Sequence, residues 1–326
     1  MTINEKYQIQ KNSKDIYFKK LTLQTEKEIM KNILFYITIV FGIFTLSSCE
    51  PSQDTDGDFL NGVTYDNTGT GGTGTTPAKL LKKVTIDDDG DVLIYTYTYN
   101  SSKRLTGVTT DDGSIKINIT YASSGNISKI VRTENSMGTI STEEIVPVYT
   151  SNQITKLNVT HNEASKSIKS VANLTYAPNG WPATIKEEIY GEDNTSVVAN
   201  FVSSLSYSGN NISKWNFKSS FKTGLPVPVF DFLQEMELTV TLSDYDNKIN
   251  PYNLLPKDFL ISTVHAEADA SSITGFAKNN SKKANVVFVF NGTPLTDSQT
   301  MSYTYDKDGY PTSVGSADIL TKFEYQ

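Results

Sequence analysis

The sequence of 326 residues is poor in the side chains that most often build metal sites and catalytic centres. It contains one cysteine, two histidines and two tryptophans. The single cysteine, Cys49, excludes an intramolecular disulfide and any metal site made of several cysteines. His161 and His265 are far apart in the sequence, and neither has a second ligand-type residue at a regular spacing. We therefore expect two surface or loop histidines, with no bound metal and no cofactor.

Catalytic signatures are equally scarce. Neither a G-x-S-x-G nucleophile elbow nor a P-loop occurs in the chain. The acidic dipeptides Glu143-Glu144 and Glu187-Glu188 would direct their carboxylates to opposite faces of a strand, so neither pair suits glycoside hydrolysis. The sequence predicts a protein without enzymatic activity. The alternative is a hydrolase whose carboxylates converge only in the fold.

Basic residues are in short supply over most of the chain. The formal net charge is −7, divided into +3 for residues 1–48 and −10 for the remainder. An acidic body repels phosphate backbones. We therefore expect no nucleic-acid partner.

Residues 30–48 have the pattern of a secretory signal. Met30 and Lys31 precede a run of 14 mostly apolar residues, Ile33–Leu46. A basic start followed by a short apolar core and small residues is typical of a signal peptide. The run is shorter than the roughly 20 residues that a transmembrane helix needs.

The residues that follow the apolar run, Leu46-Ser47-Ser48-Cys49, resemble the lipobox of bacterial lipoproteins. The resemblance implies that Cys49 is lipidated, becomes the mature N-terminus and anchors the protein to the membrane. Lipoprotein signals begin within a few residues of the initiator. We therefore expect Met30 to be the true start and residues 1–29 to be a mistaken extension.

A tether is predicted for residues 49–78. Glu50–Asp58 is acidic, which is similar to the run that exports Bacteroidetes lipoproteins to the cell surface; a solvated spacer would have the same composition. Asp66–Pro77 consists almost wholly of glycine and threonine, as in flexible linkers. Folded structure should begin near Lys79.

The body of the chain repeats one unit, seen most clearly in Leu205–Trp215. A strand ends in tyrosine, a turn follows, and the next strand opens with a β-branched or aromatic residue. The tyrosines of the other copies are Tyr99, Tyr121, Tyr149, Tyr176 and Tyr305, with Tyr245 in a degenerate copy. In four copies the apolar residues after the turn are three apart, as in Leu105 and Val108. A flat strand cannot place both on one face, so a β-bulge or a late turn is expected.

Strict alternation and turn dipeptides indicate the fold class. Within Ile115–Tyr121, isoleucines alternate with polar residues, as in an antiparallel sheet with one covered face. Asp89-Gly90 and Asp308-Gly309 are typical of hairpin turns. We predict a single all-β domain over residues 79–326. It should be a large antiparallel meander of hairpins, strongly curved or closed into a soluble barrel-like sheet.

The repeat pattern weakens between residues 225 and 270. Leu225-Pro226-Val227-Pro228 cannot lie in a central strand, because two prolines would remove backbone donors. The sequence predicts one irregular insertion here, with a short helical segment.

The tyrosine frame resembles, in a loose form, the YD-type repeats of RHS-like proteins. Residues 30–326 resemble an uncharacterised group of Bacteroidetes lipoproteins, through the signal, the Gly/Thr tether, the tyrosine hairpins, Asp246–Pro251 and Lys278–Asn280. The resemblance implies a large, porin-like antiparallel sheet with no established activity.

These features predict an outer-membrane or cell-surface lipoprotein that acts as a binding or scaffold module. Its partners would be the membrane, through the anchor, and a glycan or another envelope protein. A glycan-binding accessory of a polysaccharide-uptake system is an alternative. For that role, candidate stacking residues are Trp181, Trp215, Tyr190 and Tyr310, unless they serve as core or cross-strand residues.

Overall fold

The structure is a computed structural model that describes residues 79–136, 139–163, 166–191, 193–221, 235–264, 273–290, 292–316 and 319–326. The predicted extension, signal, tether and Cys49 lie outside the described residues, as does His265.

The described residues form 17 strands. The first nine are β1 (Leu81–Asp88), β2 (Asp91–Tyr99), β3 (Leu105–Thr110), β4 (Ile115–Tyr121), β5 (Ile127–Ser136), β6 (Thr139–Thr150), β7 (Gln153–Glu163), β8 (Lys166–Tyr176) and β9 (Pro182–Tyr190). The others are β10 (Val197–Ser208), β11 (Asn211–Phe221), β12 (Glu235–Tyr245), β13 (Ser281–Phe290), β14 (Thr293–Thr300), β15 (Ser302–Tyr305), β16 (Pro311–Gly315) and β17 (Ile319–Tyr325). Between β12 and β13 lie the 3-10 helix η1 (Pro251–Leu254) and the helix α2 (Lys257–Thr263).

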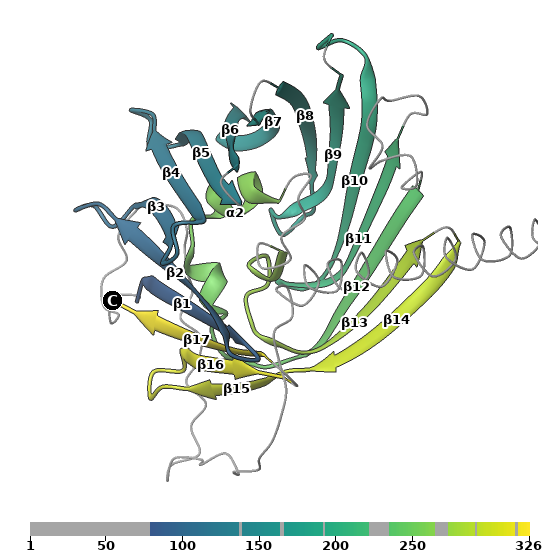
Figure 1. The fold of residues 1–326 in the computed structure, drawn as a ribbon. Helices are drawn as coiled ribbons and strands as arrows, with labels where there is room; N and C mark the ends of the chain where they lie inside the picture. The colour runs from purple at the N-terminus through teal and green to yellow at the C-terminus, as the bar shows by residue number, and fades with distance from the viewer. Residues whose placement is uncertain are drawn as a thin grey trace, which may run out of the picture. The chain divides into compact units, whose positions relative to one another are not determined.

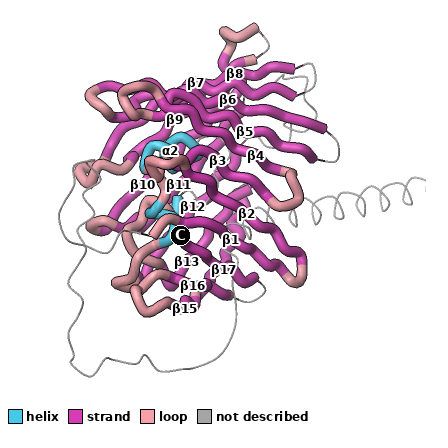
Figure 2. The backbone as a smooth tube through the Cα atoms, turned by 90° about the vertical axis from the view of Figure 1, so that its left-hand side faces the viewer, coloured by secondary structure: helices cyan, strands magenta, loops and turns pink. Residues whose placement is uncertain are grey.

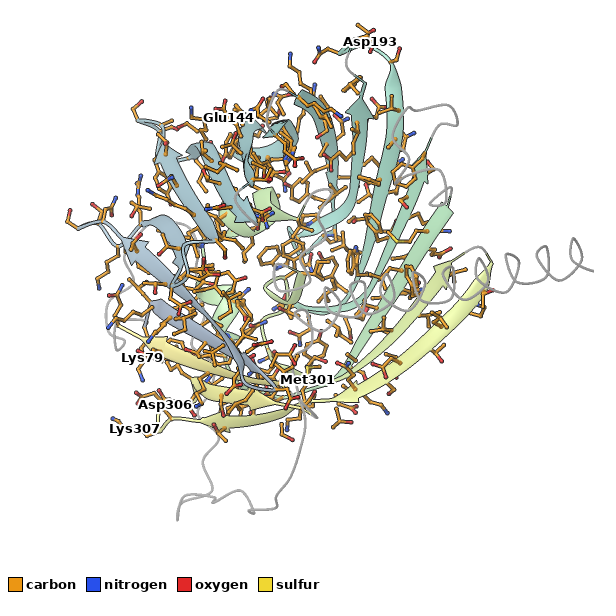
Figure 3. All side chains as sticks on the ribbon, in the orientation of Figure 1. Lys79, Glu144, Asp193, Met301, Asp306 and Lys307 are labelled. Atoms are coloured by element: carbon orange, nitrogen blue, oxygen red, sulfur yellow. The ribbon has the colours of Figure 1, made fainter. Side chains whose placement is uncertain are left out.

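The strands form one antiparallel sheet that returns to its starting strand (Figure 1). Each strand from β1 to β13 pairs with the next one in the sequence, β15 pairs with β16, and β16 pairs with β17. β17 then pairs with β1. β14 continues into β15 at Met301, labelled in Figure 3, so one bent strand pairs first with β13 and then with β16. The predicted all-β meander, closed into a barrel-like sheet, is confirmed.

The alternation of side chains decides which face of the sheet is the core. On β4 the side chain of Ile119 is buried, whereas Lys116, Asn118 and Thr120 are exposed. The same phase holds on β7, where Leu157 is buried and its neighbour Lys156 is exposed. The apolar face therefore lines the inside of the closed sheet, and the polar face is turned to the outside.

The predicted bulge is present at the repeat tyrosines. The pairing register shifts between Thr98 and Tyr99, because Tyr99 faces Leu105 while Thr98 faces Gly107. Equivalent shifts occur at Tyr121, Tyr149, Tyr176, Tyr207 and Tyr305. The extra residue lets both Leu105 and Val108 point inward, and both are buried.

The repeat tyrosines also form hydrogen bonds across neighbouring strands. Five of their hydroxyls, and the hydroxyl of Tyr325 at the end of β17, donate to the carbonyl of a residue near the start of the preceding strand. These pairs are Tyr99 with Leu81, Tyr121 with Leu105, Tyr176 with Ile154, Tyr207 with Pro182, Tyr245 with Ile212 and Tyr325 with Pro311. Burial raises the pKa of these phenols, so they remain donors at physiological pH. All of these tyrosines lie at one end of the strands.

The predicted irregular insertion is also confirmed, and it occupies this same end. We call residues 246–264 and 273–280 the plug, and we call this end of the sheet the plug end. Phe259, Leu260 and Phe276 of the plug are buried. In Figure 2 the helical segments, drawn in cyan, lie near the C-terminus among the loops at one end of the strands. Within the range expected to be irregular, Glu235–Tyr245 instead forms the full strand β12.

Side chains fasten the plug to the strands and to the turns of the plug end. The rings of Trp181 and Phe276 stack with centroids 4.9 Å apart. Lys257 donates to the carbonyl of Gly180, and its Nζ lies 5.0 Å from the centroid of the Trp181 ring. Among the described residues, no helix has the length and apolar character needed to cross a membrane.

Candidate ligand-binding site

The end of the sheet opposite the plug, here called the far end, contains the turns that join β1 to β2, β3 to β4 and each later odd-numbered strand up to β13 to the next strand. The side chains that face inward there are different from those at the plug end. On β5, β6 and β7, Arg132, Glu143 and His161 lie directly opposite one another, Arg132 beside Glu143 and Glu143 beside His161. Directly paired residues on one face of a sheet have Cβ atoms about 5 Å apart. The three side chains therefore form one continuous polar row.

A second set of polar residues continues the row toward the far end. Glu134 is two residues beyond Arg132 on β5 and forms an ion pair with its guanidinium. Ser141, opposite Glu134, completes the lining of a small pocket with Glu134, Arg132, Glu143 and His161. The cavity between these side chains has a volume of about 10 Å³, which is room for about one water molecule, and it is partly open to solvent. This cluster is called the inner pocket below.

The floor of the inner pocket is apolar. The next inward-facing residues toward the plug end are Ile130, Ile145 and Val159, and all three are buried. They are also directly paired, so an apolar row runs beside the polar row. Glu143 lies against this floor and is only 8% exposed. A carboxyl group that is buried beside apolar side chains is costly unless it is hydrogen-bonded or paired with a charge.

The outer face of the same strands provides a contrast. Glu144, labelled in Figure 3, follows Glu143 in the sequence but points to the outside, where its carboxylate lies 3.3 Å from Lys129 Nζ. The expectation that adjacent glutamates would point to opposite faces therefore holds at this dipeptide. It also holds at Glu187-Glu188, because Glu187 is buried and Glu188 is exposed.

Glu187 belongs to a separate inner network on β8 and β9. Its carboxylate accepts a hydrogen bond from the hydroxyl of Ser170, and only 3% of the residue is exposed. Farther along the inner face, the indole of Trp215 donates to Ser203 at 3.1 Å. These residues pair with one another inside the sheet and do not line the inner pocket.

The four aromatic residues proposed for ligand stacking are placed far from one another. Trp215 is buried on β11, Trp181 lies in the β8–β9 turn against the plug, and Tyr190 ends β9 at the far end. Tyr310 is buried in the β15–β16 turn, where its ring meets that of Tyr325 at 5.3 Å. Lys79 lies above Tyr310, with its Nζ 4.8 Å from the centroid. The fold does not bring the four rings together into one platform.

Asp258 and Asp308, two acidic residues at the plug end, show how the surroundings of a carboxyl group shift its pKa in opposite directions. Burial raises the pKa of Asp258 on α2, although the hydroxyl of Tyr149, 3.0 Å from the carboxylate, partly opposes the shift. The pKa of Asp308 is lowered, mainly by the hydrogen bond from Lys79 at 2.7 Å. Lys79 also contacts Asp306 at 2.6 Å, and Figure 3 shows Lys79 and Asp306 on the same side of the ribbon. Neither Asp258 nor Asp308 lines the inner pocket.

The described part of the chain holds no group of three or more acidic, histidine or cysteine side chains arranged to bind a metal ion. This includes the inner pocket, where Glu134, Glu143 and His161 come from three strands.

Sequence reasoning did not identify the inner pocket. His161 was expected to be a surface or loop residue, but it lies on strand β7, turned inward and only partly exposed. The sequence does contain one indication of this pocket, namely which residues along a strand point to the same face as the buried apolar ones. Val159 and His161 share a face, as do Ile145 and Glu143, so charged residues at inward positions could have been recognised. Which charged residues are neighbours depends on the register, which the sequence does not show.

No family model matches the chain, and none of the curated proteins matches it. Among solved structures, the chain is similar to a porin-like protein from Bacteroides uniformis ATCC 8492, with 16% identity and a TM-score of 0.45 over 76% of this chain and 96% of that one. It is also similar to a porin-like protein from Bacteroides vulgatus ATCC 8482, with 8% identity and a TM-score of 0.49 over 76% of this chain and 99% of that one.

Proposed function

We propose that this protein is a lipid-anchored, non-enzymatic binding module of the bacterial cell envelope, and that its ligand site is the inner pocket. The observation that carries the proposal is the row Arg132–Glu143–His161. Charged side chains on the inner face of a sheet are costly to desolvate. They gather around a pocket at the end of the sheet that the plug does not fill.

The outer face supports a body surrounded by water. A barrel embedded in lipid presents an apolar band to the outside and polar residues to its interior. Here the outer positions of β4 are Lys116, Asn118 and Thr120, and apolar residues fill the inside. The proposed attachment to the membrane is therefore through a lipid on Cys49.

The position of Lys79 is compatible with such an anchor. Lys79 lies at the plug end, held by Asp306 and Asp308. A Gly-rich tether over residues 49–78 would have a root-mean-square span of about 30 Å. It would join the body at the end opposite the inner pocket, which leaves the pocket free to receive a ligand.

Fractionation of cells tests the anchor. The wild-type chain should be recovered with the membrane and released by detergent, and Cys49→Ala should be found in the soluble fraction. Recovery of Cys49→Ala with the membrane would contradict lipid anchoring at this residue.

Thermal-shift measurements on the full chain test the ligand site. A panel of glycans, peptides and divalent cations should contain a ligand that raises the melting temperature. At 100 times its Kd such a ligand adds about 2.7 kcal/mol. The shift should be lost in Glu143→Gln and kept in Glu144→Gln. If both variants respond like the wild type, the ligand binds elsewhere.

A hydrolase is the second candidate, because Glu134 and Glu143 from neighbouring strands line the same pocket. Glycoside hydrolysis requires two carboxylates that face one bond. Incubation of the protein with oligosaccharides separates the two functions. Products that appear with the wild type and disappear with Glu134→Gln or Glu143→Gln would show an enzyme, whereas binding without products would support the binding module.

A further inference from the structure

We infer that the outer face of strands β7 to β11 is a docking surface for the anionic lipid headgroups of the membrane. These strands follow one another around the sheet (Figure 1). The inference rests on the proposed lipid anchor, because it describes how the anchored body lies on the membrane. The surface is called the lysine wall and is defined by five exposed lysines: Lys156, Lys169, Lys186, Lys214 and Lys218.

The pairing register places three of these lysines in one row. Lys156 lies opposite Asn173, and Asn173 lies opposite Lys186. On the next two strands, Lys186 lies opposite Val202, and Val202 lies opposite Lys218. Since neighbouring strands are about 4.8 Å apart, the backbone positions of successive lysines in the row are about 10 Å from one another.

The wall is positive although residues 49–326 carry a net charge of −10. In the described part of the chain, Glu188 is the only acidic residue on the outer face of β7 to β11. Its carboxylate accepts a hydrogen bond from the hydroxyl of Tyr190 at 3.1 Å. On the neighbouring strand β12, Glu237 pairs with Lys218 at 3.1 Å and marks the border of the wall. Five lysines and one glutamate leave an excess of four positive charges.

The ammonium groups of the wall are accessible to a partner. No ion pair joins Lys156, Lys169 or Lys186 to another residue that the structure describes. The side chain of Lys218 remains 59% exposed beside Glu237. Each lysine that comes close to an anionic membrane strengthens the attraction roughly fivefold, and salt screens it.

The composition of the wall fits lipid headgroups better than it fits a protein. Protein interfaces are enriched in aromatic side chains and depleted in lysine. Between the lysines of the wall lie short side chains such as Asn173, Thr184 and Val202. None of the large, exposed apolar side chains of the described residues belongs to the wall. The wall therefore touches the membrane surface without inserting into it.

The proposed anchor explains why a membrane meets the wall. A lipid on Cys49 and a tether with a root-mean-square span of about 30 Å keep the body close to the headgroups. Docking is then intramolecular, so a weak attraction is enough. The wall lies along the sides of the strands, and docking leaves the inner pocket at the far end open. Without the anchor the wall is too weak to withstand dilution, so Cys49→Ala should still be released into the soluble fraction.

A fluorophore on one added cysteine tests the docking. The full chain is reconstituted in vesicles through its own lipid, which occupies the thiol of Cys49 under the proposed function. Asn173→Cys places the fluorophore within the lysine row, and Asn118→Cys places it on the outer face of β4 as the matched control. The vesicles are phosphatidylcholine, alone or mixed with the anionic phosphatidylglycerol. A lipid with a nitroxide on its headgroup quenches a fluorophore that touches the surface.

On anionic vesicles we expect the fluorophore of Asn173→Cys to be quenched at least fivefold more strongly than that of Asn118→Cys. The difference should disappear on neutral vesicles. It should also disappear in 1 M salt, where the Debye length is about 3 Å.

Two triple variants of the labelled chain connect the quenching to the wall. The first removes three lysines of the wall and should lower the ratio of docked to undocked protein by about a hundredfold: Lys156→Gln, Lys169→Gln and Lys186→Gln. The second removes the same charge from β1, β4 and β17 and should leave the ratio unchanged: Lys83→Gln, Lys116→Gln and Lys322→Gln.

The outcomes separate the inference from the proposed function. Equal quenching of the two fluorophores on anionic vesicles, or quenching that the first triple variant does not lower, would overturn the inference and leave the lipid anchor intact. Tighter binding of soluble dextran sulfate than of anionic vesicles at equal negative charge would assign the wall to a soluble polyanion and also overturn it.

Failure of the unlabelled chain to float with neutral vesicles would instead overturn the proposed anchor. Flotation of that chain with anionic vesicles then decides the inference. Flotation that the first triple variant abolishes and the second keeps would support the lysine wall, and the absence of flotation would overturn it.

Discussion

The two ends of this sheet are made from the same hairpins but are filled differently. At the plug end, aromatic and aliphatic side chains such as Phe276 and Leu260 are packed until almost none of their surface is exposed. At the far end, inward positions carry Arg132, Glu143 and His161 around a pocket. Inward-facing positions thus form a core where the plug contacts them and a candidate site where it does not.

The difference shows that burial within a closed sheet is not uniform. Tyrosine hydroxyls bonded to neighbouring carbonyls satisfy polar groups at the plug end and leave little capacity for a ligand. At the far end, Leu295 and Ile168 remain partly exposed although they lie on the inner face. Tight packing is therefore concentrated at the plug end of the strands, and the proposed ligand site lies at the opposite end.

The largest expected effect comes from emptying the plug core. Phe276→Ala removes a ring that is 0% exposed and stacks on Trp181, so the free energy of unfolding should fall by about 3–5 kcal/mol. Leu295→Ala, at a position 44% exposed at the far end, should change it by less than about 0.5 kcal/mol. Chemical denaturation of both variants measures the difference. Similar losses in the two variants would contradict the division between core and site.

A smaller effect is expected from the tyrosine hydroxyls. Tyr207→Phe removes the donor to the carbonyl of Pro182, 2.8 Å away and partly buried, and should cost about 0.5–1.5 kcal/mol. Tyr190→Phe, at the far end, removes a bond to the exposed side chain of Glu188 and should cost almost nothing. Chemical denaturation measures both losses. Equal losses in the free energy of unfolding would show that the tyrosine hydrogen bonds of the plug end stabilise the fold no more than the exposed one at the far end.

The pH dependence of stability should have opposite signs at Asp258 and Asp308. Burial raises the pKa of Asp258 above its value in the unfolded chain, so the folded state holds this proton more tightly. The Asp258 contribution to the free energy of unfolding therefore falls as the pH rises from the unfolded pKa through the folded one. For Asp308, whose pKa is lowered by Lys79, the contribution is present above the unfolded pKa and is lost on acidification.

Denaturation curves between about pH 3 and pH 7 for Asp258→Asn and Asp308→Asn would check these signs. Relative to the wild type, Asp258→Asn should gain stability as the pH rises, and Asp308→Asn should lose it. If the stability of both variants relative to the wild type changed in the same direction with pH, the surroundings of one of the two carboxyl groups would differ from those in the structure.

The smallest change in the free energy of unfolding is expected from substitutions at the free edge of β14. This strand pairs with β13 on one edge, whereas its other edge has no partner strand among the described residues. Pro294 has no N–H, and the N–H of Ser298 donates to its own neighbour Asp297 at 2.8 Å. Since alternate residues direct their N–H groups to the same edge, these features remove two donors from the free edge and discourage edge-to-edge pairing.

The double variant Pro294→Val with Asp297→Val should therefore self-associate, while its free energy of unfolding at low concentration changes by less than about 0.5 kcal/mol. Size-exclusion chromatography with light scattering detects the association. Asn158→Val, on the outer face of a strand paired on both sides, is the matched control and should remain monomeric. A monomeric double variant would show that other features protect the edge.

Much of the fold could be predicted from local patterns. The alternation around Ile119 predicted the inner and outer faces, the spacing of Leu105 and Val108 predicted a bulge, and Asp89-Gly90 predicted a turn. Each of these depends on residues close together in the sequence. The helical segment of the insertion was expected within residues 225–270, although its position in the plug core was not.

The candidate site could not be predicted in the same way. Arg132, Glu143 and His161 become neighbours only through the registers of β5–β6 and β6–β7. A shift of one residue in either pairing would move one of them out of the row. No local pattern in the sequence showed whether the candidate aromatic residues would be neighbours. In the structure they lie at four different places: Trp181, Trp215, Tyr190 and Tyr310.

The sequence by itself determined that this protein is an antiparallel meander with apolar residues inside and tyrosines at the ends of alternate strands. These properties follow from the period of two along a strand and from the residues that each turn requires. Only the tertiary structure decided that β17 closes the sheet against β1, that the plug fills one end, and that the charged residues meet at the other. Closure and filling depend on contacts between residues more than 100 positions apart, such as Tyr149 with Asp258, which no local pattern encodes.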